Sequence, residues 1–134
     1  MSYRWAEHTA EVELHIEAAS EEAVFEQALQ ALGRLVREGC ARSARASVSR
    51  EVSVAAGDRA TLLAAWLNEL VYLIETEDLV PDEVEHLELA DGRLAATVRA
   101  YPGRPRHLVK GATYNELTFE PAGNGFSATV VLDV

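Results

Sequence analysis

Cysteine is nearly absent from this sequence, because Cys40 is the only one. A single cysteine excludes an intramolecular disulfide and any cysteine-paired metal site, so Cys40 is expected to be a small, partly buried residue. Long hydrophobic runs are also missing. The longest strongly apolar stretch, LLAAWL at residues 62–67, is far too short to span a bilayer, and MSYRWAEHT lacks the apolar core of a signal peptide. We therefore expect a cytoplasmic protein with no membrane partner.

Positive charge is scarce as well. The 134 residues include 12 Lys and Arg against 22 Asp and Glu, which gives a formal net charge of −10. Non-specific nucleic-acid affinity comes mainly from Lys and Arg that displace condensed counterions, so strong direct nucleic-acid binding is not expected. A basic protein surface or a metal cation suits this field better. One local cluster is basic and is either an anion or partner site or a solvated edge strand and loop; it comprises Arg99, Arg104, Arg106, His107 and Lys110.

The common catalytic motifs are missing too: there is no P-loop, G-x-S-x-G, H-E-x-x-H, cysteine pair or Rossmann glycine fingerprint. The patterns that are present are structural. Residues 11–17, EVELHIE, alternate apolar and polar side chains, which is typical of a strand with one face on a core. Ser20 is a candidate N-cap for a helix that Gly39 closes. A second alternating stretch predicts a strand over residues 48–54.

A second helix is predicted from Asp58, its candidate N-cap, to about Glu75, and its wide apolar face favours a central, most buried position. Pro81 disfavours helical geometry in the residue before it, so the helix ends ahead of that point. The remainder predicts strands, with a type I′ hairpin at Asp91-Gly92, another hairpin at PAGNG, and a last strand over 126–134.

Two helices provide too few crossovers for a parallel doubly wound sheet, so the fold class predicted is α+β. We expect one domain over residues 1–134, built as two layers. A mainly antiparallel or mixed sheet would carry both helices on one face, in the order β-α-β-α followed by about four or five strands.

Carboxylates at element ends are the residues that could carry chemistry. Glu7 and Glu11 flank the start of the first predicted strand, and Asp133 closes the last one. Carboxylate oxygens bind hard cations such as Ca²⁺, Mg²⁺ or Mn²⁺. These acids can converge only if the first and last predicted strands are neighbours. The alternative is ordinary solvation of an exposed strand, with His8 as a structural residue.

Several stretches together resemble the archease family, whose first strand usually opens D-H-T-A-D. They are EHTAEVELHI, SEEAVFEQALQALGRLV, LLAAWLNELVYLIE, KGATY and VVLDV, which occur in the family's order over almost the whole chain. The resemblance implies an accessory protein rather than a catalyst. Archeases activate the GTP-dependent RNA ligase of tRNA splicing and RNA repair, by promoting guanylylation of the ligase's active-site histidine and multiple turnover.

The resemblance also implies a divalent cation, with Ca²⁺ expected and Mg²⁺ or Mn²⁺ as alternatives. Carried onto this sequence, its ligands are Glu11, Asp133 and the backbone carbonyl of Val134, with Glu7 and His8 as further candidates. Both motif aspartates are replaced by the longer Glu7 and Glu11, which puts the site's geometry and metal choice in doubt.

A second departure concerns the family's K-A-x-T-Y-H stretch, which has Asn115 in place of the histidine, so a proton-transfer role there is doubtful. The alternative function is a small metal-dependent enzyme acting on a phosphorylated or nucleotide substrate, with His8 as acid or base.

Overall fold

The computed structural model describes residues 2–8, 11–37, 46–103 and 109–134, and within them the side chains of residues 6–8 are not described. The elements in chain order are β1 (Ser2–His8), β2 (Glu11–Ala18), α1 (Glu21–Arg37), β3 (Val48–Ala55), α2 (Arg59–Glu77), β4 (Leu79–Ala90), β5 (Arg93–Pro102), β6 (Gly111–Ala122) and β7 (Gly125–Asp133).

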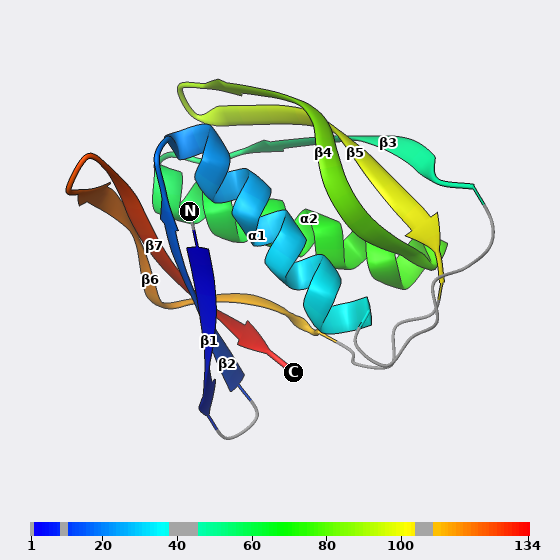
Figure 1. The fold of residues 1–134 in the computed structure, drawn as a ribbon, viewed down its shortest axis with the longest axis horizontal. Coiled ribbons are helices and arrows are strands. Elements are labelled where there is room, and N and C mark those ends of the chain that lie inside the picture. Colours follow the sequence, from blue (N-terminus) through cyan, green and yellow to red (C-terminus); the bar gives the residue numbers. More distant parts are fainter. Residues whose placement is uncertain (1, 9–10, 38–45, 104–108) are drawn as a thin grey trace.

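The strands form two antiparallel sheets that flank the two helices (Figure 1). Sheet A has the strand order β1-β2-β7-β6 and sheet B the order β3-β5-β4. Each helix contacts strands of both sheets, α1 chiefly β4 and β2, and α2 chiefly β6 and β3. The predicted α+β class and antiparallel pairing are confirmed. Two details differ: β1 precedes the first predicted strand, and the strands divide between two sheets instead of one.

Helix α1 begins as its sequence predicts. The Ser20 hydroxyl accepts a hydrogen bond from the Ala23 N–H at 3.1 Å, which satisfies one of the free donors of the first turn. The helix packs very closely on sheet B at Gly33, where an added Cβ would lie 2.2 Å from the Pro81 carbonyl oxygen. The expected closing residue, Gly39, and the single cysteine, Cys40, lie outside the described residues.

Helix α2 is capped by Asp58, whose Oδ1 accepts a hydrogen bond from the Thr61 N–H at 2.7 Å. This backbone bond, with a smaller contribution from the Thr61 side chain, lowers the pKa of Asp58. The helix continues two residues past the predicted Glu75, and Asp78 ends it in a left-handed conformation with φ 52°. Trp66 is fully buried, and its indole N–H donates to the Phe25 carbonyl of α1 at 3.0 Å.

The expectation that α2 is the more buried helix is wrong. Nine residues of α1 and nine of α2 are buried. Because a sheet lies against each side of the helix pair, both helices are covered over much of their circumference, and neither is more central. The core combines these residues with the inner faces of both sheets.

Both predicted hairpins are present, β4–β5 at Asp91-Gly92 and β6–β7 at Gly123-Asn124. The prediction of a type I′ turn is wrong: that turn needs a positive φ at both central residues, and Gly92 has a φ of 70° but Asp91 has no positive φ. In β7, Ala128, Val130 and Leu132 are buried and belong to the core.

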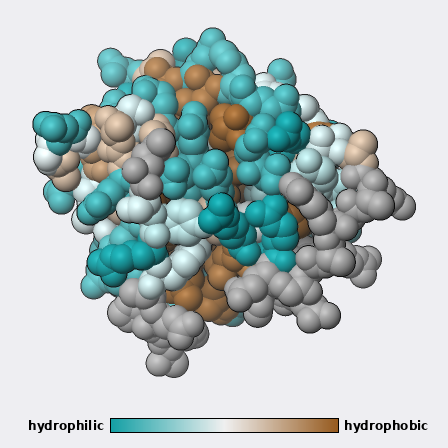
Figure 2. All heavy atoms as spheres, in the orientation of Figure 1, coloured by the Kyte–Doolittle hydropathy of each residue, from teal (hydrophilic) through white to brown (hydrophobic). Residues whose placement is uncertain are grey.

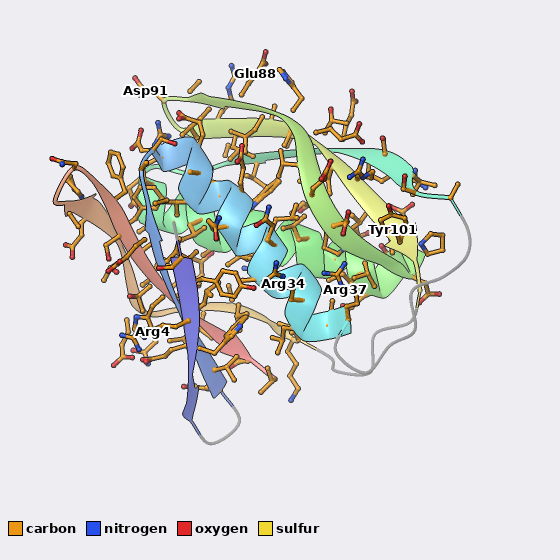
Figure 3. The ribbon with its side chains drawn as sticks, viewed as in Figure 1. Arg4, Arg34, Arg37, Glu88, Asp91 and Tyr101 are labelled. Carbon is orange, nitrogen blue, oxygen red and sulfur yellow. The ribbon has the colours of Figure 1, made fainter. Side chains whose placement is uncertain are left out.

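The surface is largely polar. The face in Figure 2 is mostly hydrophilic, with small hydrophobic areas between the polar side chains. Arg99, from the basic cluster, lies against Asp82 and Glu83. Asp82 also pairs at 3.0 Å with Arg37, which lies near the end of α1 (Figure 3). Lys110 is exposed, and Arg104, Arg106 and His107 lie outside the described residues. No helix of the described chain is long and apolar enough to cross a bilayer.

Candidate functional site

One row of residues crosses all four strands at an end of sheet A. His8 of β1 pairs with Glu11 of β2, Glu11 pairs with Asp133 of β7, and Asp133 pairs with Gly111 of β6. Direct cross-strand partners have their side chains on the same face of a sheet. Glu11 and Asp133 therefore lie side by side on the face opposite the one that buries Leu14. The first and last predicted strands are neighbours, as the convergence of these two acids requires.

Two carboxylates in this position repel each other. Like charges directly opposite on an antiparallel pair are destabilising, and both side chains are half-buried, where repulsion is screened less than at the open surface. A cation between the two acids would reverse the sign of this interaction. The donor set is oxygen only, which fits a hard divalent cation such as Ca²⁺, Mg²⁺ or Mn²⁺.

The remaining candidates are less closely grouped. Val134 is exposed and directly follows Asp133, so its carbonyl is next to one of the two facing acids in sequence. Glu7 pairs with Val12, one row away from Glu11, and the side chains of Glu7 and His8 are outside the described part of the structure. Among the residues that are described, no group of three or more His, Cys, Asp or Glu side chains is close enough to hold a metal ion.

Backbone and amide contacts hold Asp133 on its β6 side. The Lys110 N–H donates to the Asp133 carbonyl at 2.8 Å. Just after Lys110, at the start of β6, the Ala112 N–H donates a hydrogen bond to the side-chain carbonyl of Asn68 at 2.7 Å. The sequence analysis assigned no role to Asn68. Its signal is a carboxamide inside the apolar run WLNEL of α2, a position where an unpaired polar group would be costly.

Farther along the same face, three side chains link β2 and β7. His15 has Nε2 3.3 Å from Glu13 Oε2 and Nδ1 3.2 Å from Thr129 Oγ1. The imidazole of His15 is half-buried. The His15–Thr129 contact belongs to the same strand register that places Glu11 opposite Asp133.

Strand β6 bulges just beyond Thr113, because its pairing with β7 resumes only at Thr118. Tyr114 and Asn115 are exposed in this bulge, and Glu116 has a positive φ of 58°. Asn115, where the family pattern has histidine, is thus on the surface, in the same strand as Gly111, the cross-strand partner of Asp133.

These features define an acidic α+β protein with two antiparallel sheets around two helices and a pair of facing carboxylates on sheet A. The family model of the archease protein family matches residues 3–134. Protein archease of Methanosarcina mazei is 31% identical over 141 residues, covering 98% of this chain and 95% of that protein. Protein archease of Archaeoglobus fulgidus is 30% identical over 142 residues, covering 100% of both. The chain belongs to the archease family.

Two solved structures share the fold, each with a TM-score of 0.70 and 22% sequence identity. One is the crystal structure of an archease from Thermotoga maritima, described as a possible chaperone, which covers 96% of this chain and 94% of that chain. The other is the solution structure of a Methanobacterium thermoautotrophicum protein, with 98% of each chain covered. At this identity the likeness establishes the fold alone, and it agrees with the α+β class.

Proposed function

We propose that this protein is an accessory activator of a GTP-dependent RNA ligase, which it assists by promoting guanylylation of the ligase's active-site histidine and multiple turnover. The observation that carries the proposal is family membership over residues 3–134. In this role the protein contacts a ligase and does not itself join RNA.

The charge of the chain supports a protein partner of this kind. An RNA ligase needs a basic surface to bind the phosphate backbone, and this chain has a net charge of −10. The two proteins would attract each other, and the attraction would weaken as ionic strength rises. An acidic protein would also avoid competing with the ligase for RNA.

We also propose that Glu11, Asp133 and the Val134 carbonyl hold a divalent cation, with Ca²⁺ as the expected ion and Mg²⁺ or Mn²⁺ as alternatives. When bound, the cation would supply a positive charge that phosphate oxygens can coordinate. Glu11 and Asp133 would bind and orient the ion from facing strands, which the His15–Thr129 contact also joins. The side chain of Glu11, longer than that of Asp, would let its carboxylate reach an ion from a backbone set farther away.

The experiment that tests the proposal measures transfer of labelled GMP from GTP onto the cognate ligase, with and without this protein. We expect the protein to increase guanylylation and to convert single-turnover ligation into multiple turnover. Unchanged guanylylation and turnover across a wide range of added protein would contradict the proposal. Turnover of a phosphoester or nucleotide by the protein alone would instead favour the metal-dependent enzyme with His8 as acid or base.

A further inference from the structure

The amide of Asn68 binds the main chain of β6 as a neighbouring strand would. Its Oδ1 accepts from the Ala112 N–H at 2.7 Å, and its Nδ2 lies 3.5 Å from the Ala112 carbonyl oxygen. A carboxamide carries both an acceptor and donors, so it can replace the peptide group of an adjacent strand. Strand β6 is an edge of sheet A, and an edge strand leaves such backbone groups without strand partners.

The support for this contact is rigid. Asn68 lies in the middle of α2, between the fully buried Leu67 and Leu70, so the backbone that carries its side chain is fixed by the core. Gly111 lies directly against the amide, since an added Cβ there would come within 2.8 Å of Asn68 Oδ1. The start of β6 is thereby tied to a core helix and not only to its neighbouring strand.

The same segment of β6 holds Asp133. Gly111 is the cross-strand partner of Asp133, and the Lys110 N–H donates to the Asp133 carbonyl. Asp133 is the last residue of β7, and strand ends open easily unless neighbouring segments hold them. Asn68 therefore holds the main chain at Ala112, and the adjoining Lys110 holds the main chain of Asp133, whose carboxylate faces Glu11.

We propose that Asn68 is a positioning residue for the cation site of Glu11 and Asp133, acting by anchoring the start of β6. The inference rests on the cation site of the proposed function. Asn68 is not a ligand in this role, and its contribution is the placement of Asp133. Residues that orient metal ligands typically affect metal affinity by about 10- to 100-fold.

The test measures divalent-ion affinity by calorimetry with Ca²⁺ and Mn²⁺, together with hydrogen exchange of the Lys110 amide. Asn68→Ala should weaken the affinity by about tenfold or more and speed exchange at Lys110. Asn68→Asp keeps an acceptor for the Ala112 N–H, so it should preserve Lys110 protection and bind more tightly than Asn68→Ala. Thr76→Ala, which removes a hydrogen bond to the Tyr72 carbonyl within α2, is the control and should bind like wild type.

Gly111→Ala disturbs the contact from the opposite side, because its Cβ would displace the Asn68 amide and its φ of 159° is one that residues with side chains rarely adopt. It should weaken binding as Asn68→Ala does, and it decides the question if Asn68→Ala fails to fold. Affinities within about twofold of wild type in both variants would overturn the proposal, as would wild-type protein that binds no divalent ion. Guanylylation of the ligase plays no part in these measurements, so ligase activation can succeed or fail independently of Asn68.

Discussion

At the scale of single residues, Glu11 of β2 and Asp133 of β7 are direct cross-strand partners. If Glu11 and Asp133 share one cation, Glu11→Ala and Asp133→Ala should each remove most of the divalent-ion binding. The double variant should lose little more than the worse single one, because residues acting on one site are not additive. Glu17→Ala is the control, since Glu17 is exposed and its cross-strand partner is Ser127. Calorimetric titration of all four variants and wild type measures this.

Independent surface charges would give another pattern. Each substitution would then change the free energy of unfolding by less than about 0.5 kcal/mol, and the effects would add. Equal isotherms for the wild type and the Glu11 and Asp133 variants would mean that the Glu-for-Asp exchanges mark a lineage without this metal.

The sequence pattern placed Glu11 and Asp133 at strand ends, because alternation marks where a strand begins and ends and the acids stand at those positions. It also located both caps, Ser20 and Asp58, since each has a short polar side chain ahead of an apolar periodic run. It did not locate Asn68, whose role depends on a strand 44 positions away. No local signal reports which strand a helix side chain will meet.

Among the elements, α1 approaches β4 very closely at Gly33. Gly33→Ala would place a methyl group 2.2 Å from the Pro81 carbonyl oxygen, so helix and strand must separate. Overpacking of this kind typically costs about 1–3 kcal/mol, and a backbone neighbour has little freedom to yield. Chemical denaturation should show the loss as a lower midpoint. Gly57→Ala, where an added Cβ meets nothing within 4 Å, is the matched control, and an equally stable Gly33→Ala would contradict the packing described.

Periodicity and turn signals predicted every described element except β1 in order, but the division into two sheets was missed. Alternation in β3, β4 and β5 predicts one buried face for each strand and does not say which sheet contains it. Strand β1 was missed as well, because SYRWAEH has only Tyr3 and Trp5 as large apolar residues. Its pairing with β2 reveals it.

In the molecule as a whole, Trp66 joins the two helices within a core that both sheets share. Trp66→Ala should lower the free energy of unfolding by about 3–5 kcal/mol, because a large buried side chain leaves a cavity. Denaturant titration measures this, and Tyr72→Ala, on the same helix but 61% exposed, is the control and should change it little. A Trp66→Ala protein as stable as the wild type would be incompatible with the buried position of this indole.

The order of the strands in sheet A has a consequence for synthesis. Sheet B is built from one continuous stretch, residues 48–102, whereas sheet A joins β1 and β2 to β6 and β7. His15 and Thr129, which meet across this junction, are 114 positions apart. On a ribosome, sheet B and its hairpin can assemble while β6 and β7 are still untranslated. Glu11 acquires its partner acid only when β7 has emerged and docked, so the paired carboxylates exist only in molecules in which β7 has joined sheet A.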